Sequence, residues 1–423
     1  MALLNWRTSR RRFLEGNSLL PILSGLLPSR VCGLAKSREA VTGPGDSAAP
    51  NIHERLGVRT RINAKGTYTY LTGSLLPPEV AQAMEEAAQH YVVLEELQRA
   101  AGERIAKLLG VEAACVTSGA AGAMTLGVAA CITGSDSEKI KRLPDTTGMK
   151  NEVVIQRKHR YAFDHAIRNV GVRLVEVETE EDLERAINAR TAMLHFLNEA
   201  QNQGQIGLQK WVEAGKRHNI PTFNDAAADV PPVSHLSDYN KMGFDLVCFS
   251  GGKGLRGPQC SGLLLGRKDL IDAALLNNNP SEDTIGRPLK VGKEEIVGMY
   301  VALERYLKID HEAEWKDWES RLDTIGNAVS AVAGVHTGRF VPEVANHVPH
   351  LYLQWDEKAM GITQVECLKQ LEACDPSIVC LGGEDYPYGL AVTPFMMKPG
   401  EENVVGQRIA ELLQAAQARS KTS

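Results

Sequence analysis

The stretch FSGGKGLRGPQCSG (residues 249–262) continues the apolar run FDLVCF and places one lysine, Lys253, among five glycines and a proline. The apolar run is typical of a buried strand, and the glycines predict a tight turn where that strand ends. A lysine in such a loop is ordinarily solvated. Its significance therefore depends on which other polar groups reach the same edge of the fold.

The chain around this stretch alternates between strand-like and helix-like segments. Helix-like sequences separate the apolar runs at residues 113–119, 152–156, 173–177, 191–197, 220–225 and 244–250. Such alternation predicts an α/β fold with a mainly parallel sheet covered by helices on both faces. Ligands of such folds bind where loops leave the carboxyl ends of the strands.

The two ends of the chain differ from this central part. After about residue 275 a long helix, strand-like pieces and a closing helix predict a smaller C-terminal α/β domain, so we expect a large domain at 51–274 and a small one at 275–423. Residues 36–50 are small, polar and rich in Gly and Pro, as in a linker. Residues 1–35 contain SRRRFL and a short apolar segment broken by proline, which resembles a twin-arginine export signal. An unstructured basic tail on a cytoplasmic protein would have the same composition.

Composition excludes several classes of partner. The net charge of −5 and the lack of a long basic run after the first dozen residues argue against nucleic acid. No segment is apolar enough to cross a membrane. The eight cysteines show no Cys-x-x-Cys pair and no zinc spacing, which predicts free thiols and no metal site. A small-molecule partner is therefore expected.

Two further strand ends carry unusual polar groups. The run VTSGAAGA leaves a strand through Ser118, Gly119 and Ala120 into a helix of small residues, an arrangement that suits a phosphate or simply tight packing. The run PTFNDAAADV ends a strand at Asp225, which is costly to bury unless a positive or protonated group meets it, or which could instead be an N-cap. Together with Lys253, these groups would match pyridoxal 5′-phosphate, which has a phosphate, a ring nitrogen and an aldehyde.

From about residue 52 onward the sequence also resembles the selenocysteine synthase-like branch of the fold-type I pyridoxal-phosphate enzymes. This branch includes the bacterial seryl-tRNA selenium transferases and D-glucosaminate-6-phosphate ammonia-lyase. The matching segments are RLGVRTRINAKGTYTYLTGSLLPPEV, VTSGAAGAMTL, FNDAAADV, FSGGKGLRGPQCSGLLLGRKDLI and GRPLKVGKEEIVGMYVAL. The resemblance implies an aminotransferase-like large domain, a small C-terminal domain, and a homodimer or larger homo-oligomer with active sites at subunit interfaces.

The resemblance also implies roles for individual residues. Ser118, Gly119 and Ala120 match the phosphate turn, Asp225 matches the partner of the ring nitrogen, and Lys253 matches the Schiff-base lysine. Two further positions carry less specific matches. Ser250 is a candidate phosphate contact, and His159 falls where related enzymes place a residue that stacks on the cofactor ring, although it could equally be a surface loop histidine.

Three basic residues are candidates for binding a substrate anion. Arg287 and Lys290 match a basic pair that the selenium transferases use near the active site, although exposed basic residues before a helix are commonly just solvated. Arg256, three residues after the lysine, is a similar candidate. Near the C-terminus, YGLAVTPFMMKPGEE lacks the arginine with which many fold-type I aminotransferases hold a substrate carboxylate, which disfavours amino-group transfer.

The sequence thus predicts a lyase acting on an amino acid or an amino sugar acid. Lys253 would remove the α-proton, a β-substituent would leave, and a keto acid and ammonia would be released. A transferase, racemase or aldolase remains open because the same carbanion leads to each. A degenerate binding protein is less favoured, because both Lys253 and Asp225 are present.

Overall fold

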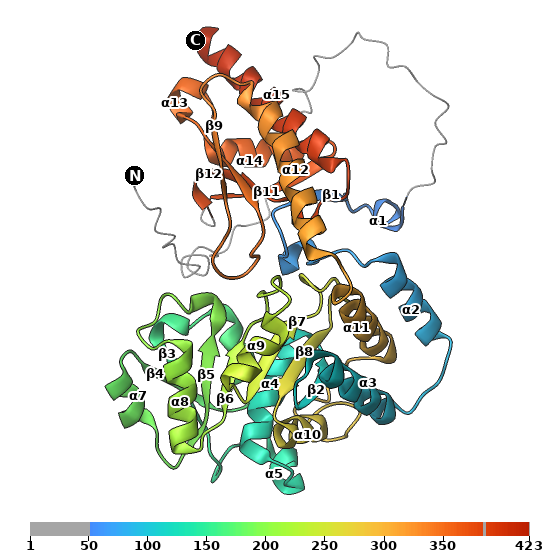
Figure 1. The fold of residues 1–423 in the computed structure, drawn as a ribbon, viewed down its shortest axis with the longest axis vertical. Coiled ribbons are helices and arrows are strands. Elements are labelled where there is room, and N and C mark those ends of the chain that lie inside the picture. Colours follow the sequence, from blue (N-terminus) through green and yellow to red (C-terminus); the bar gives the residue numbers. More distant parts are fainter. Residues whose placement is uncertain (1–50, 384–385, 423) are drawn as a thin grey trace, which may run out of the picture.

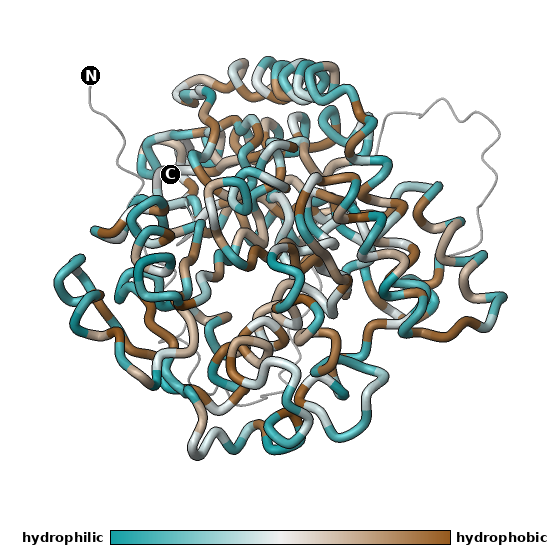
Figure 2. The backbone as a smooth tube through the Cα atoms, turned by 60° about the horizontal axis from the view of Figure 1, so that its bottom comes forward, coloured by the Kyte–Doolittle hydropathy of each residue, from teal (hydrophilic) through white to brown (hydrophobic). Residues whose placement is uncertain are grey.

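The computed structural model describes residues 51–383 and 386–422, and the expected export signal and linker lie outside this part of the chain. The described chain forms two β-sheets, each covered by helices (Figure 1). Figure 2 shows hydrophobic and hydrophilic residues mixed along most helices, as expected for helices with one buried side. Within the described residues, no helix is long and apolar enough to cross a membrane.

The first sheet has seven strands and confirms the predicted, mainly parallel α/β architecture. Only β8 runs antiparallel to its neighbours. Every residue of β3 and β5 is buried, which explains their nearly continuous apolar sequences. In spatial order the strands are β2 (Ala113–Thr117), β8 (Gly262–Gly266), β7 (Leu246–Ser250), β6 (Thr222–Asp225), β5 (Thr191–Leu197), β3 (Glu152–Gln156) and β4 (Arg173–Val177).

Helices cover both faces of this sheet, and each face has its own hydrophobic core. The core on one face includes residues of α3 (Leu94–Leu109), α8 (Leu208–His218), α9 (His235–Met242) and α11 (Lys293–Tyr306). The other core includes residues of α4 (Gly119–Thr133), α6 (His165–Arg168) and α10 (Lys268–Leu276), and α5 (Ser137–Arg142) packs against α4. The helix α7 (Glu180–Ala186) follows β4.

The second sheet is smaller and mostly antiparallel, with the exception of β1, which runs parallel to β11. Its strands, in spatial order, are β1 (Arg61–Ala64), β11 (Ser377–Gly383), β12 (Tyr386–Val392), β10 (His350–Gln354) and β9 (His336–Phe340). Its helices are α12 (His311–Ser330), α13 (Glu357–Met360), α14 (Gln364–Ala373) and α15 (Glu401–Thr422).

The division between the two sheets does not follow the boundary expected at residue 275. The strand β1 lies in the range expected for the large domain but pairs with β11 of the second sheet. In the opposite direction, α11 lies in the range expected for the small domain, but it buries Ile296, Met299 and Leu303 in a core of the first sheet. It also packs against α2 (Pro78–Ala88), which follows the short helix α1 (Ile52–Arg55) and β1.

Candidate active site

Three of the predicted polar groups meet at one edge of the first sheet. Ser118 follows β2, Asp225 ends β6, and Lys253 follows β7. The strands β6 and β7 are parallel neighbours, and β8 pairs antiparallel with both β7 and β2, so β2, β6 and β7 all end at this edge. The sheet topology therefore brings together groups that lie up to 135 residues apart in the sequence, between Ser118 and Lys253.

The turn after β2 has unpartnered polar groups of the kind that bind an anion. Ser118 precedes α4 as its N-cap without bonding the helix, and its buried Oγ has no hydrogen-bond partner among the described residues. Gly119 adopts the left-handed conformation, φ +71°, which favours glycine. The first amides of a helix also lack intrahelical acceptors. A free hydroxyl beside free amides at a helix N-terminus fits a phosphate group.

The last glycine of the lysine stretch packs directly against this turn. A Cβ atom on Gly262 would lie 2.4 Å from the carbonyl carbon of Gly119 and 2.8 Å from the amide nitrogen of Ala120. Within α4, a Cβ atom on Gly122 would lie 2.5 Å from Ser118 Oγ. The small residues therefore let β8 pack closely against the candidate phosphate turn and leave room for the Ser118 side chain.

Asp225 is almost completely buried, and hydrogen bonds hold its carboxyl group in place. Its Oδ1 accepts from Ala227 N at 3.1 Å and from Cys248 Sγ at 3.5 Å, and its Oδ2 accepts from Tyr161 Oη. Burial raises the pKa of Asp225, and the nearby Tyr161 hydroxyl and Lys253 amine act in the opposite direction. Because Oδ2 has one described donor, it keeps acceptor capacity for a ring N–H.

Tyr161 and His195 form a neutral aromatic pair beside Asp225 that the sequence did not indicate. Their rings are nearly parallel, with centroids 6.2 Å apart and an interplanar angle of 10°. Burial raises the pKa of Tyr161 well above its usual value and lowers the pKa of His195 to about 3. Tyr161 therefore remains a hydrogen-bond donor to Asp225. In the sequence, only the position of Tyr161, two residues after His159, could have suggested a role at the site.

His159 is fully buried among the loops that follow β3 and β5. Its Nδ1 lies 3.2 Å from the donating Leu197 N, and its Nε2 lies 3.2 Å from Gln156 Nε2. Its ring meets Phe196 edge-on, with centroids 4.4 Å apart. Burial lowers the pKa of His159 to about 4, so its ring is neutral near pH 7. The stacking role expected for His159 stays a prediction, and Tyr161 is a second candidate for it.

The turn that carries Lys253 is contacted by residues that follow β1, a strand of the second sheet. Ser74 Oγ donates to Gly252 O at 3.0 Å, and a Cβ atom on Gly73 would lie only 2.2 Å from the same oxygen. Gln259 Nε2 donates to Thr69 O at 3.1 Å. Residues 69–74, which follow β1, therefore lie directly against the lysine turn.

Ser250, the last residue of β7, lies beside the strand end that carries Asp225. Its backbone N donates to Ala227 O at 3.2 Å, and its side chain is partly exposed. This places Ser250 at the same edge as the candidate phosphate turn. A direct contact with phosphate stays a prediction.

Arg256 is half-buried and contacts residues that belong to the second sheet's part of the chain. Its Nη2 donates to Phe395 O at 2.8 Å and lies 3.7 Å from Glu314 Oε1, and burial lowers its pKa. Arg256 also has a left-handed backbone, φ +54°. Its guanidinium therefore has protein partners, which leaves the predicted substrate contact without structural support.

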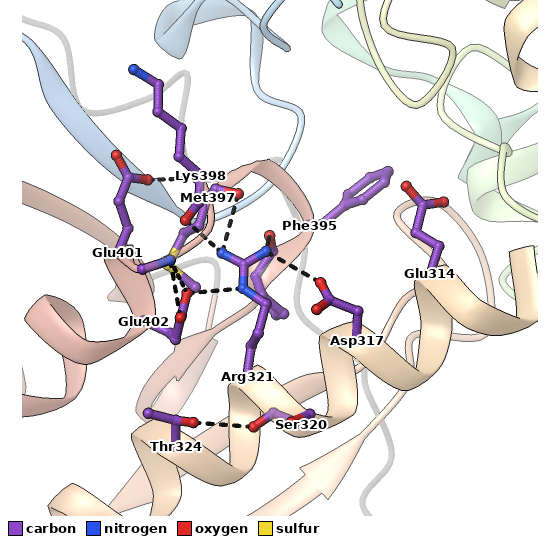
Figure 3. Close-up of polar contacts among 12 residues, drawn as sticks. Glu314, Asp317, Ser320, Arg321, Thr324, Phe395, Met397, Lys398, Glu401 and Glu402 are labelled. Atoms are coloured by element: carbon purple, nitrogen blue, oxygen red, sulfur yellow. Dashed lines mark hydrogen bonds and ion pairs between the residues drawn. The ribbon is translucent and has the colours of Figure 1, made fainter. Parts of the chain in front are cut away.

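Arg321 of α12 is a buried arginine that the sequence did not indicate (Figure 3). It bonds Glu402 Oε2 through Nε at 2.9 Å and the carbonyl of Lys398 through Nη2 at 2.7 Å. The carbonyls of Pro394 and Met397 are additional acceptors. Figure 3 shows this guanidinium enclosed by the segment that leads into α15. Arg321 thus stabilises residues 394–402, a segment that contains no arginine.

Arg287 and Lys290 are exposed residues of the loop between α10 and α11. The structure leaves both side chains accessible to a soluble anion. Within the described part of the chain, no group of three or more His, Cys, Asp or Glu side chains could hold a metal ion, and the seven cysteines found there are free thiols.

Comparison with known proteins identifies the family of the chain. The family model described as L-seryl-tRNA selenium transferase matches residues 61–318. The chain is 30% identical to D-glucosaminate-6-phosphate ammonia lyase of Salmonella typhimurium, across 87% of this chain and 99% of that protein. It is 31% identical to 5'-C-glycyluridine monooxygenase-decarboxylase of a Streptomyces species, across 85% and 92%. An L-seryl-tRNA(Sec) selenium transferase of Mannheimia succiniciproducens is 29% identical across 60% of this chain and 58% of its own length.

Solved structures show the same relationship. A structure of D-glucosaminate-6-phosphate ammonia-lyase aligns with a TM-score of 0.77 over 87% of this chain and 99% of its own, at 30% identity. A serine palmitoyltransferase of S. paucimobilis with bound PLP-myriocin aligns with a TM-score of 0.52 at 13% identity, which indicates a shared fold. The expected fold-type I, aminotransferase-like architecture and the family resemblance are both confirmed.

Proposed function

The chain belongs to the L-seryl-tRNA selenium transferase family, and we propose that it is a pyridoxal 5′-phosphate-dependent lyase that acts on an amino acid or amino sugar acid. The observation that carries this proposal is the convergence of Ser118, Asp225 and Lys253 on one edge of the first sheet. The Salmonella typhimurium relative, which this chain matches over 99% of its length, is named an ammonia lyase.

The residues at this edge fit the proposed cofactor. The free Ser118 hydroxyl and the first amides of α4 suit its phosphate, Asp225 suits its ring nitrogen, and Lys253 suits its aldehyde. When bound, pyridoxal 5′-phosphate supplies an aldehyde that takes up an amine and a ring that accepts the electrons left by a departing proton.

The protein's own groups would then carry the proton transfers. The Lys253 amine would take the α-proton as a general base. Asp225 would favour the protonated ring nitrogen, and Tyr161 would hold the Asp225 carboxyl through its hydrogen bond. Loss of a β-substituent, followed by hydrolysis, would release a keto acid and ammonia.

We infer that Arg287 and Lys290 bind an anionic group of the substrate, such as a phosphate or carboxylate, because both side chains are exposed and basic. Arg256 is a weaker candidate for binding this anion, because it already donates a hydrogen bond to Phe395 O and pairs with Glu314. Neutralising both exposed residues should raise KM more than it lowers kcat, since they would act on binding.

A homodimer or larger homo-oligomer is part of the proposal. Several large apolar side chains are exposed around α2, where a second copy could cover them: Tyr70, Leu75, Leu76, Tyr91, Val92 and Val93. Exposed apolar side chains that gather in one region often mark interaction surfaces. We also propose export through the twin-arginine signal, and a chain without a working signal would stay in the cytoplasm.

A screen of products tests the function. Purified protein supplied with the cofactor would be incubated with D- and L-amino acids and with phosphorylated and unphosphorylated amino sugar acids, while ammonia and keto acid are measured. Equal release of ammonia and keto acid, with and without oxygen, supports the lyase. Turnover that requires oxygen would favour the chemistry named for the Streptomyces relative. Racemised, cleaved or transferred products would instead identify a racemase, an aldolase or a transferase.

A further inference from the structure

Arg256 has an unusual backbone conformation in the turn that carries Lys253. Its φ of +54° is left-handed, a conformation that among non-glycine residues is found mainly for asparagine, aspartate and histidine. Its backbone N donates to Lys253 O at 2.9 Å, so the two residues begin and end one tight turn. Unfavourable backbone conformations persist where surrounding contacts hold them, and they concentrate at functional sites. The contacts that hold Arg256 therefore bear on Lys253.

The side chain of Arg256 reaches from the lysine turn to residues 393–397, the segment that follows β12. Its Nη2 donates to Phe395 O at 2.8 Å, and its guanidinium carbon lies 6.0 Å from the centroid of the Phe395 ring. The same Nη2 lies 3.7 Å from Oε1 of Glu314, near the start of α12. Both partners belong to the part of the chain that builds the second sheet and its helices. Arg256 thus joins the lysine turn to that part.

Phe395 is a firmly held partner for this contact. Its side chain is buried, and its ring meets Trp318 of α12 edge-on, with centroids 5.3 Å apart. Arg321 donates to the carbonyl groups of Pro394 and Met397, on either side of Phe395 (Figure 3). An arginine that bonds Phe395 O is therefore bonded to a segment that is itself fixed to α12.

The neighbouring positions in the lysine turn provide no such link. The two residues beside the lysine are glycines, and Leu255 is buried in a core of the first sheet. A Cβ atom on Gly254 would lie 3.5 Å from Phe395 Cζ, so the same phenyl ring also lies close to the turn. Of the described side chains of residues 252–257, only that of Arg256 bonds the segment after β12. A shift of that segment would therefore act on the lysine turn through Arg256.

We propose that Arg256 is a positioning residue, which ties the lysine turn to the segment after β12 and thereby places the Lys253 amine for reaction. The guanidinium holds the protein and not the substrate, because its Nη2 is engaged by Phe395 O and Glu314. An amine displaced by about 1 Å reacts far more slowly, since the reacting atoms must meet at a defined distance and angle. The inference rests on the proposed function only for the reaction of Lys253.

Hydrogen exchange in the full, cofactor-free chain tests whether Arg256 holds the turn. Arg256→Asn keeps a residue that tolerates the left-handed backbone, but its side chain is too short to reach Phe395 O. We expect the amides of residues 251–261 to exchange about tenfold faster in this variant than in the wild type, because the turn opens more often. Mass spectrometry of peptides from the exchanged protein measures these rates.

Two further variants show whether the missing contact causes the effect. Arg256→Lys, whose ammonium group can still reach Phe395 O, should exchange more slowly than Arg256→Asn. Asn219→Asp is the matched control, because Asn219 also has a left-handed backbone, φ +51°, and the substitution changes the net charge by the same amount. Asn219 is exposed at the end of α8, so this variant should follow the wild type.

The reaction of Lys253 tests whether the tie serves the proposed function. Cofactor-free protein would be mixed with pyridoxal 5′-phosphate and reduced with borohydride after increasing times, and the modified Lys253 peptide would be measured. We expect its rate of formation and kcat each to fall about tenfold in Arg256→Asn, with a smaller change in KM, because positioning affects reaction more than binding. Arg256→Lys should recover part of both losses, and Asn219→Asp should show neither.

Other outcomes overturn the inference. Equal exchange in the wild type and Arg256→Asn would show that the arginine does not hold the turn. Faster exchange with unchanged kcat and unchanged modification of Lys253 would show that the reaction does not need the tie. A raised KM with unchanged kcat would instead identify Arg256 as a substrate contact.

Two safeguards keep the test decisive. If Arg256→Asn fails to fold, Arg256→Gly takes its place with Asn219→Gly as its control, because glycine has no Cβ atom to oppose the left-handed backbone. If the wild type takes up no cofactor, the proposed function fails, while the exchange rates still decide whether Arg256 holds the turn.

Discussion

At the scale of single residues, burial and hydrogen bonding act in opposite directions on Asp225. Burial raises the pKa of its carboxyl, whereas Tyr161, Lys253 and the Ala227 amide favour the ionised form. A protonated ring nitrogen in this place would add the strongest favourable partner. Binding of the cofactor should therefore stabilise the buried carboxylate of Asp225, which is unfavourable in the cofactor-free protein.

Replacing Asp225 by asparagine should separate cofactor attachment from catalysis. The neutral amide cannot stabilise a protonated ring, so we expect turnover to fall by about 100-fold or more while cofactor absorbance is retained. Steady-state kinetics and a spectrum of the same sample measure both. Cys248→Ala, which removes only the 3.5 Å sulfur contact, should stay within about threefold of wild type. An Asp225→Asn variant with undiminished turnover would contradict the assigned role.

The sequence could indicate Ser118, Asp225 and Lys253, because each follows or ends an apolar run and strand ends gather at one edge of a parallel sheet. It could not indicate the contact between Tyr161 and Asp225, which depends on the loop after β3 folding back across the strand ends. Nor could it show that Arg256 is held by Phe395, which lies 139 residues later.

At the scale of elements, three strands were predicted with the correct bounds, because each has a run of β-branched and other apolar residues between helix-like segments. The runs at 152–156, 173–177 and 191–197 correspond to β3, β4 and β5. The pairing of β1 with β11 was not predicted, since the two strands lie more than 300 residues apart and four residues carry no partner signal. The sequence also did not predict that β8 runs antiparallel to β2 and β7.

The close approach of β8 to the phosphate turn gives an element-scale prediction. In Gly262→Ala the new methyl would lie 2.4 Å from the Gly119 carbonyl carbon, so the turn must shift. We expect the Kd for pyridoxal 5′-phosphate to rise about tenfold or more, measured by equilibrium titration of the cofactor-free protein. Gly207→Ala has no atom within 4 Å of the new methyl and should bind as the wild type does. Equal affinities for both variants would rule out this turn as the phosphate site.

At the scale of the whole molecule, the site depends on both sheets. Residues 69–74 follow β1 of the second sheet and contact the lysine turn of the first, and Arg256 and Phe395 join the two on another side. This arrangement requires the chain to pass from the second sheet to the first and back again. The sequence predicted two domains. It could not show that β1 joins the second sheet or that α11 packs on the first.

The exposed apolar residues around α2 lead to a prediction about assembly. A charge introduced by Tyr91→Asp should disrupt a contact between two copies of the chain, so the wild type should be a dimer or larger and the variant a monomer. Size-exclusion chromatography with light scattering measures the mass of each. Val365→Asp, on the exposed side of α14, should leave the mass unchanged. A monomeric wild type would remove the oligomer from the proposal.

The identity of the lysine that holds the cofactor tests the central claim most directly. Protein incubated with pyridoxal 5′-phosphate, reduced with borohydride and digested should yield one modified peptide, with the added mass on Lys253. Lys253→Arg, which keeps the positive charge, should yield none and should lack the visible absorbance band. An adduct on any other lysine, or no adduct on the wild-type chain, would contradict the assignment of this site.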